Sequence, residues 1–443
     1  IRKSLIASGK RLVVVDDDPT GMQTIHGVSV FMNWSVDVFH KALASGAPVF
    51  FVSTNSRSLN AAEAQALSFE VGRNLREAVR REGIEILLAF RSDSTLRGHF
   101  PYEVDALTSG LGLELDGIII APAFFEAGRY TIDDIHWAEQ DGELVPVHQT
   151  EFARDPVFGF KNSNLKAWVA EKMGNKVAVD DVQSISLRLL REGGPEAVAG
   201  ELLGASDRVP IIINATCYED LEIVALGILE AEKKGKKFAY RCAASFIKAR
   251  GGFEDKPLLT HQDLATGGGP GLIVAGSYVE KTSRQLTQLL SSGLAEGIEL
   301  RVQELLRKES RKSEIQSVTK MVNQKLADGV TTVLYTSRKL QIASKQNFPE
   351  IGNTIMQSLC EVVRRIQFRP GYLVAKGGST SIEVARTALN GKEAFAMGQI
   401  IGGVPVWRLG AEARWPEIPY VVFPGNVGDD SALLRVITVL RGA

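Results

Sequence analysis

The chain has 443 residues, of which 44% are hydrophobic and 23% charged, and its 51 basic and 52 acidic side chains leave a net charge of −1. This length predicts two domains, and the composition is that of a globular protein. The balanced charge argues against a general nucleic-acid-binding protein. No stretch approaches the roughly 18 uninterrupted apolar residues of a membrane span, and the N-terminus lacks the apolar run of a signal peptide. We therefore expect a cytoplasmic protein that binds neither nucleic acid nor membrane.

Short apolar runs alternate along the chain with longer amphipathic stretches. None of the runs alternates strictly between apolar and polar residues, which is typical of strands buried on both faces of a parallel sheet. The alternation predicts an α/β fold with helices such as 61–82 and 283–290 between the strands. The expected strands are 12–15, 49–52, 86–90, 117–120, 209–213, 272–275, 332–335, 372–375 and 420–423.

A glycine-rich segment divides this pattern into two halves. Gly251-Gly252 and Thr266–Pro270 flank a polar stretch, and a strand pattern restarts directly afterwards. We expect an N-terminal domain over residues 1–255, a linker over 256–270 and a C-terminal domain over 271–443, with mainly parallel sheets and a ligand cleft between the domains. Residues 123–165 interrupt the rhythm and are interpreted either as an excursion near a substrate site or as a surface insertion.

Three adjacent carboxylates follow the first expected strand. Asp16, Asp17 and Asp18 repel one another, so their clustering at a strand end is costly unless a cation or ligand hydroxyl groups use them. In open α/β sheets ligands bind beyond the carboxyl ends of the strands. We interpret the cluster as a site that binds a substrate hydroxyl or takes its proton; the alternative is an acidic loop that caps the next helix.

A second polar cluster, Arg91-Ser92-Asp93-Ser94-Thr95-Leu96-Arg97, follows the third expected strand. Arg91 and Arg97 could bind a carboxylate through two hydrogen bonds each, and Asp93, Ser94 and Thr95 could bind hydroxyl groups. Arg57, after the second strand, is another candidate for an anion. Such a set suits an acid sugar, although solvated arginines beside a helix cap remain the alternative.

Three small-residue turns in the second half each join a strand to a helix. They are Gly276-Ser277, Gly377-Gly378-Ser379-Thr380 and Gly425-Asn426. Glycines there let backbone N–H groups approach phosphates, and the helix N-termini favour negative charge. Each turn alone is more often a plain helix cap, and none is a GxxxxGK[ST] loop. Together they predict a nucleotide with several phosphates.

These motifs resemble those of the four-carbon acid sugar kinases. The resemblance rests on DDPTG at 17–21, DSTLRG at 93–98, GS at 276–277, GGST at 377–380 and GN at 425–426, in the family's order and over nearly the whole chain. It implies an N-terminal domain for the acid sugar and a C-terminal domain for ATP, and an ATP-dependent kinase acting on threonate, erythronate or 3-oxotetronate. This chain has a third Asp before the motif, Pro19 within it and Met22 where the commoner DDxTGA pattern has Ala, which leaves the substrate's identity open.

The resemblance, together with the clusters, assigns the expected roles. Asp17 and Asp18 are the candidates for orienting or deprotonating the hydroxyl. The expected substrate contacts are Asp17, Arg57, Arg91, Asp93, Ser94, Thr95 and Arg97. The expected ATP contacts are Ser277, Gly377, Gly378, Ser379, Thr380, Gly425 and Asn426. ATP would act as its Mg²⁺ complex, no protein ligand of the metal is assigned, and a homodimer is left open.

Two other functions fit parts of the sequence. Asp16-x-Asp18-x-Thr20 after a strand matches the first motif of haloacid-dehalogenase-type phosphatases, but a short motif without its context is weak. That alternative leaves the clusters at 93–98 and 377–380 unexplained. The other is a small-molecule sensor without catalytic activity, built on two α/β lobes, which the phosphate loops argue against.

Overall fold

The computed structural model describes residues 1–140, 142–174, 176–264, 267–338 and 348–442. The chain forms two compact units: Ile1–Thr24 with Asn33–Asp255, and Ile25–Met32 with Lys256–Ala443. The segment Ile25–Met32 therefore belongs to the second unit, whereas the prediction of a first domain over residues 1–255 assigned it to the first. Residue 141, in the expected excursion, and residues 265–266, in the expected linker, lie outside the described residues.

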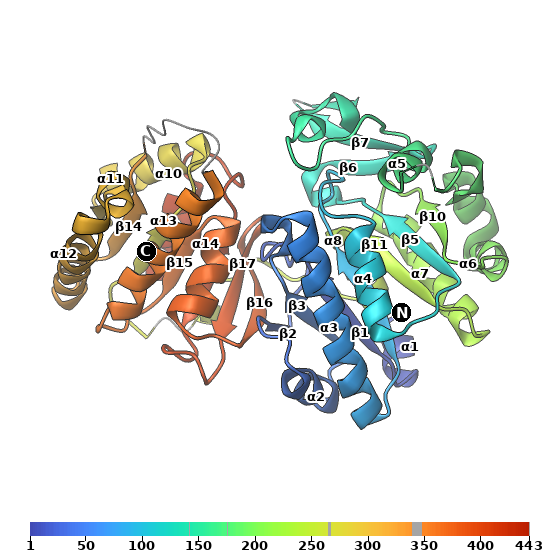
Figure 1. The fold of residues 1–443 in the computed structure, drawn as a ribbon, viewed down its shortest axis with the longest axis horizontal. Coiled ribbons are helices and arrows are strands. Elements are labelled where there is room, and N and C mark those ends of the chain that lie inside the picture. The colour runs from blue at the N-terminus through green and yellow to red at the C-terminus, as the bar shows by residue number, and fades with distance from the viewer. Residues whose placement is uncertain (141, 175, 265–266, 339–347, 443) are drawn as a thin grey trace. The chain divides into compact units, whose positions relative to one another are not determined.

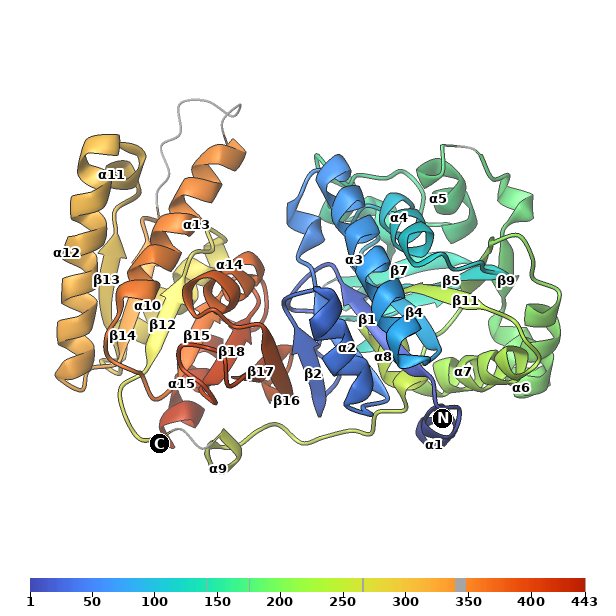
Figure 2. The same cartoon turned by 60° about the horizontal axis from the view of Figure 1, so that its bottom comes forward.

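The first unit is built on a parallel sheet (Figures 1 and 2). Its strand order is β3-β1-β4-β11-β5-β10-β9, and all neighbouring strands in this order pair parallel. The strands are β1 (Arg11–Asp16), β3 (Val49–Ser53), β4 (Ile86–Arg91), β5 (Gly117–Ala121), β9 (Gln183–Ile185), β10 (Val209–Ile213) and β11 (Phe238–Cys242). All five residues of β3, β5 and β11 are buried, as strands covered on both faces require.

Helices cover this sheet, and their ends follow local sequence signals. In α3 the Asn60 side chain accepts from the Glu63 N–H while Glu63 accepts from the Asn60 N–H, and Gly83 ends the helix in a left-handed conformation. Helices α3 and α4 pack together, as do α6 and α7. The helices are α1 (Arg2–Ala7), α2 (Val36–Ala44), α3 (Ala61–Glu82), α4 (Tyr102–Leu111), α5 (Leu165–Lys172), α6 (Leu187–Leu203), α7 (Tyr218–Lys233) and α8 (Ala244–Gly251).

The excursion over residues 123–165 contains a small sheet of its own. Strands β6 (Arg129–Ile132), β7 (Ile135–Gln140) and β8 (Glu143–Pro146) pair antiparallel in sequence order. The short helical turns Val147–Gln149 and Glu151–Arg154 follow. The excursion is thus ordered structure with its own hydrogen-bonded ladder.

The second unit combines parallel and antiparallel strands in the order β13-β14-β12-β15-β18-β17-β16-β2. The first five strands pair parallel. Strands β16 and β17 form an antiparallel hairpin, in which β17 pairs antiparallel with β18 and β16 pairs antiparallel with β2. The strands are β2 (Val28–Phe31), β12 (Leu272–Ala275), β13 (Glu296–Leu300), β14 (Thr332–Thr336), β15 (Leu373–Lys376), β16 (Glu393–Ile401), β17 (Val404–Leu409) and β18 (Pro419–Phe423). The predicted α/β fold with mainly parallel sheets is confirmed.

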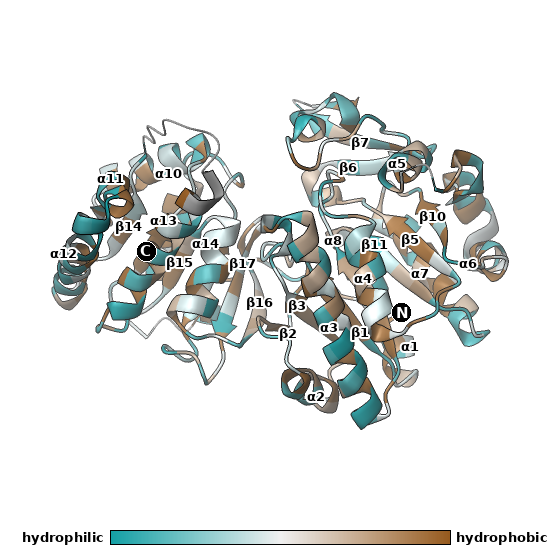
Figure 3. Ribbon diagram, in the orientation of Figure 1, coloured by the Kyte–Doolittle hydropathy of each residue, from teal (hydrophilic) through white to brown (hydrophobic). Residues whose placement is uncertain are grey.

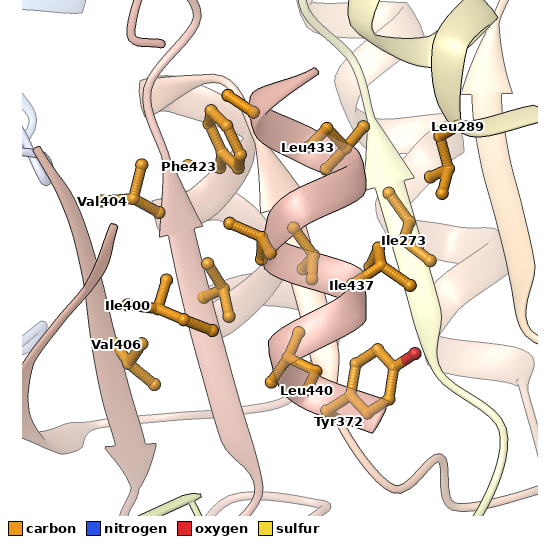
Figure 4. Packing of buried hydrophobic residues seen from close by; sticks show 14 of the residues in the cluster. Ile273, Leu289, Tyr372, Ile400, Val404, Val406, Phe423, Leu433, Ile437 and Leu440 are labelled. Atoms are coloured by element: carbon orange, nitrogen blue, oxygen red, sulfur yellow. The ribbon is translucent and has the colours of Figure 1, made fainter. Parts of the chain in front are cut away.

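A compact apolar core holds the second unit together. Leu433, Ile437 and Leu440 of α15 face Ile273 of β12 and Phe423 of β18 (Figure 4). Leu259 and Leu264, from the expected linker, are buried in this core, so much of that segment is part of the unit. The helices are α9 (His261–Leu264), α10 (Glu280–Ser291), α11 (Val302–Leu306), α12 (Lys308–Ala327), α13 (Phe348–Arg365), α14 (Gly378–Glu383) and α15 (Ala432–Arg441).

The hydropathy of the ribbon follows this layering. Strands β5 and β10 are strongly hydrophobic, whereas α12 is largely hydrophilic (Figure 3). Within the described part of the chain, no helix combines the length and the apolar character needed to cross a membrane.

Candidate functional site

In the first unit the predicted polar residues meet at the carboxyl edge of the sheet. Strand β1 lies between β3 and β4, with Asp16 opposite both Ser53 and Arg91. The turns that follow these strands therefore emerge side by side, which is where ligands bind in open α/β sheets. Residues far apart in sequence are brought to one place by the parallel pairing.

Arg57 joins the carboxylates of Asp17 and Asp18. Its Nε and Nη2 donate to Asp17 at 3.2 and 2.5 Å, and its Nη1 donates to Asp18 Oδ2 at 3.0 Å. Burial favours the neutral form of Asp18, but Arg57, Arg91 and hydrogen bonds from Thr20 outweigh it and keep the Asp18 pKa below its ordinary value. Arg57 is therefore shared between the two carboxylates, and Asp18 is ionised.

Asp16 differs from its two neighbours. Its side chain is fully buried, and burial, only partly offset by Arg91 at 3.6 Å, raises its pKa to about 8. A Cβ at Gly21 would stand 2.0 Å from Asp16 Oδ2, so only glycine fits there. A neutral, enclosed acid is a poor nucleophile, which argues against the phosphatase alternative that needs this position as an ionised carboxylate.

The loop after β4 is organised around Asp93. Its Oδ2 accepts from Thr95 Oγ1 and from Arg97 Nε, both at 2.6 Å. Burial opposes ionisation, but Arg57 and Arg97 prevail and hold the Asp93 pKa well below its usual range. Ser94 and Thr95 are buried beside it. The segment predicted to bind substrate is thus a closed network in which Arg97 already has a carboxylate partner.

Residues 123–165 pack against the loop that follows β4. His136 of β7 is buried and lies 2.7 Å from the Ser94 carbonyl oxygen through Nε2, and burial lowers its pKa to about 4. Phe152 lies under the guanidiniums of Arg97, at 5.0 Å, and of Arg129, at 5.7 Å. These contacts favour the interpretation of residues 123–165 as part of the substrate region.

Arg241 belongs to this edge of the sheet but was not predicted. It lies on β11, beside β4, and is 1% exposed, stacked 4.9 Å from the Trp168 ring. Nη2 is 3.4 Å from the Arg97 carbonyl oxygen, whereas Nε and Nη1 have no hydrogen-bond partner among the described residues. Burial lowers its pKa to about 10. The sequence held no signal for it, because an arginine inside an apolar strand is recognisable as a site residue only when the neighbouring strand is known.

The three predicted glycine turns of the second unit also converge. Strand β15 lies between β12 and β18, so the turns after these strands are adjacent. A Cβ at Gly276 would stand 2.6 Å from Thr380 Oγ1, and one at Gly425 would stand 3.2 Å from Ser277 Oγ. Gly377 has φ +116, a conformation that side chains rarely allow. A side chain would therefore be strained at Gly377 and crowded at Gly276, and would fit tightly at Gly425.

The outer members of these turns remain accessible. Ser379 and Asn426 are exposed, and Gly378, Ser277 and Gly425 are half-buried, whereas Thr380 is buried. Helix α10 supports the last turn, because Gln285 Nε2 donates to the carbonyl oxygens of Val427 and Asp429 at 3.0 and 2.8 Å. All seven predicted ATP residues thus lie on adjacent turns, of which Ser379 and Asn426 are the most exposed members.

Metal-ligating side chains do not gather at one point in the described part of the chain. Among the residues that the structure describes, no group of three or more His, Cys, Asp and Glu side chains could hold one. Mg²⁺ usually keeps several waters and binds through nucleotide phosphates with one or two carboxylates.

Comparisons with known proteins agree with this geometry. A family described as a sugar-binding N-terminal domain matches residues 12–250, and one described as a nucleotide-binding C-terminal domain matches residues 272–433. A sugar-binding domain followed by a nucleotide-binding domain defines a carbohydrate kinase. The chain belongs to the four-carbon acid sugar kinase family, and neither the phosphatase nor the sensor alternative gains support.

Curated relatives fit the same family. The chain is 26% identical over 352 residues to the D-threonate kinase of Salmonella typhimurium, covering 77% of each chain. It is 24% identical over 419 residues to the D-erythronate kinase of Heliobacterium modesticaldum, covering 88% of this chain and 87% of that one. A shorter match, 33% identical over 165 residues, is to the D-threonate kinase of Bordetella bronchiseptica.

Solved structures support the fold. A protein from Haemophilus influenzae superposes with a TM-score of 0.66 at 18% identity, over 97% of this chain and 100% of that one. A protein from Salmonella typhimurium superposes with a TM-score of 0.69 at 17% identity, over 96% and 98%. At these identities the likeness concerns the fold alone.

Proposed function

We propose that the protein transfers the γ-phosphoryl group of ATP to a hydroxyl group of a four-carbon sugar acid of the threonate or erythronate class. The observation that carries the proposal is the cluster at the carboxyl edge of the first sheet, where carboxylates that accept hydroxyl hydrogen bonds lie among guanidiniums. The glycine turns of the second unit suit the phosphates of ATP. The names of the curated relatives support the substrate class.

The charge balance of the cluster suggests which arginine binds the acid. Arg57 has Asp17 and Asp18 as partners, and Arg97 has Asp93. Arg241 has no carboxylate within ion-pair distance among the described residues, and two of its nitrogens lack hydrogen-bond partners. A buried cation without a partner is costly, and a bound carboxylate would remove that cost. Arg241 is therefore our preferred contact for the substrate's carboxylate.

In the proposed reaction the substrate hydroxyl oxygen forms a bond to the γ-phosphorus while the bond to the ADP oxygen breaks. Asp18, held ionised by its arginine neighbours, accepts the hydroxyl hydrogen bond, orients the oxygen and takes its proton as the new O–P bond forms, with Asp17 beside it. Such a carboxylate is a weak base, but phosphoryl transfer depends mainly on positioning and charge neutralisation. Bound Mg²⁺ would supply further neutralisation of the phosphates.

The test is ATP turnover with D- and L-threonate, D- and L-erythronate and 3-oxotetronate, with the neutral alcohols threitol and erythritol as matched substrates. We expect turnover with at least one acid and far less with the alcohols. Arg241→Met should raise the KM for the acid by roughly tenfold to a hundredfold, since a charge-assisted hydrogen bond is worth about 1.5–3 kcal/mol, and leave the KM for ATP within about twofold.

Arg188→Met, at an exposed arginine of α6, is the control and should behave as the wild type. Arg241→Lys keeps the charge and should fall between the wild type and Arg241→Met. Absence of turnover with every acid contradicts the proposed substrate class. Equal effects of Arg241→Met on both KM values would remove Arg241 from the carboxylate site, and release of phosphate from sugar phosphates without ATP would favour a phosphatase.

A further inference from the structure

Lys376 lies directly beneath the glycine turns of the second unit. It is the last residue of β15, is 0% exposed, and precedes Gly377. Its Nζ donates to the carbonyl oxygens of Pro424 at 2.6 Å and Gly425 at 3.3 Å, and lies 3.9 Å from the centre of the Phe423 ring. The ammonium group therefore holds the base of the turn that follows β18.

This buried cation has no counter-ion. No carboxylate lies within ion-pair distance of Lys376 among the residues described, and two carbonyl oxygens and an aromatic face are weak compensation for a desolvated ammonium. An ammonium group has three donors, and the structure gives acceptors for two of them. The site therefore has an excess of positive charge that an anionic ligand can use.

The charged groups on the surrounding elements do not supply this compensation. Glu280 and Asp430 bind Arg284, Asp429 binds Arg435, and Glu383 binds Arg386 and Thr387. Lys281 of α10 carries the same charge as Lys376 and donates to the Asn426 carbonyl oxygen at 3.2 Å. Burial first, and Lys281 second, lower the pKa of Lys376 to about 7.

We propose that Lys376 is a further nucleotide-binding residue, whose ammonium group supplies from beneath the glycine turns the positive charge against which the phosphates of ATP bind. The inference rests on the proposed function, since it assumes that the three turns hold a nucleotide. The inference adds Lys376 to the expected nucleotide contacts and couples its protonation to nucleotide binding. The phosphates favour the charged form, so binding raises the pKa of Lys376.

The coupling between nucleotide binding and protonation of Lys376 predicts the direction of the pH dependence. Well below pH 7 Lys376 is already protonated, and nucleotide binding changes its proton count little. At pH 8, above its pKa of about 7, most free molecules carry the neutral amine, so binding takes up a proton from the solution. Nucleotide affinity should accordingly fall as the pH rises from about 7 to 9, approaching tenfold per pH unit in the limit.

Calorimetric titration of the full chain with ADP and Mg²⁺ at pH 8, in buffers of different ionisation enthalpy, measures this uptake without turnover. We expect about 0.5–0.9 proton taken up per ADP bound at pH 8, and much less at pH 6 after subtraction of the proton released by ADP itself. Lys376→Arg, which stays charged, should bind ADP without proton uptake, and Lys376→Met should bind weakly without it.

Lys320→Met, at an exposed lysine of α12, should keep both affinity and proton uptake. The titration of the wild type can by itself contradict the assignment of Lys376, even if a Lys376 variant fails to fold. ADP binding at pH 8 with an enthalpy independent of the buffer overturns the assignment of Lys376, as does undiminished uptake in Lys376→Met. A wild type that binds no ADP would instead contradict the proposed function.

Discussion

Asp16 and Gly21 show how strictly two residues of the substrate region constrain each other. The Asp16 carboxyl group occupies the space that a side chain at position 21 would need, and it is closed off from solvent. Its Oδ1 accepts from the Asp18 N–H at 3.2 Å, so the buried acid fixes the backbone that presents Asp17 and Asp18. The role of Asp16 is thus to stabilise the loop that carries Asp17 and Asp18.

Replacing Asp16 by asparagine should make the first unit's stability less dependent on pH. The Asp16 pKa is about 8 in the folded protein against an ordinary value of 3.8, so the folded state holds a proton that the unfolded chain releases. The wild type should therefore lose stability relative to Asp16→Asn as the pH rises from about 4 to 8, by roughly 1 kcal/mol per pH unit. Urea unfolding at pH 5, 6.5 and 8 measures the difference, and a gap that does not widen with pH would refute it.

The glycine turn after β15 depends on how a strand, a turn and a helix join. Between β15 and α14 the chain passes through Gly377, whose φ of +116 directs the chain from the strand into the helix. Ser381 secures the junction by donating through Oγ to the carbonyl oxygens of Ala375 and Gly377, at 2.9 and 2.8 Å. The turn is therefore fixed by its own hydrogen bonds as well as by its neighbours.

Gly377→Ala should weaken this junction. Its Cβ would stand 3.1 Å from both Ser277 Cβ and Thr380 Oγ1, in a backbone conformation unfavourable to alanine. We expect a loss of about 1–3 kcal/mol in stability and a raised KM for ATP, with little change in the KM for the acid. Gly402→Ala is the matched control, because nothing lies within 4 Å of its added Cβ. Equal behaviour of the two variants in thermal unfolding and kinetics would contradict the expectation.

At the scale of the whole molecule, the chain forms two compact units, and each contains its own series of paired strands. The segment Ile25–Met32 adds β2 to the second unit, where it pairs with β16. The chain thus enters the second unit twice, once through this short segment and once through its C-terminal half. The two ligand sites predicted from the sequence are built on separate cores.

Each ligand should therefore stabilise mainly the unit that binds it. In scanning calorimetry of the full chain we expect ADP to raise the transition of the second unit and the acid substrate to raise that of the first. A ligand at 100 times its Kd adds about 2.7 kcal/mol, enough to move a transition by several degrees. A single transition that either ligand shifts equally would show that the units unfold as one.

The sequence by itself determined the fold class and the motifs. Apolar runs such as those at 49–52 and 117–120 are local, and burial on both faces of a strand follows from their composition. The same holds for α3, whose capping residues and apolar positions lie within the helix or next to it. The sequence does not predict β2, β6, β7, β8, β9, β11, β13, β16 or β17, because the apolar patterns of these strands are short or mixed.

The tertiary structure decided what depends on pairing between distant segments. It set the strand orders, the antiparallel hairpin of β16 and β17, and the passage of β2 into the second unit. It also decided the charge partners: Arg57 is occupied by Asp17 and Asp18, whereas Arg241 and Lys376 are buried without a carboxylate among the described residues. Electrostatic energy depends on distance in space and on burial, so the roles of these charges follow from the fold and not from sequence spacing.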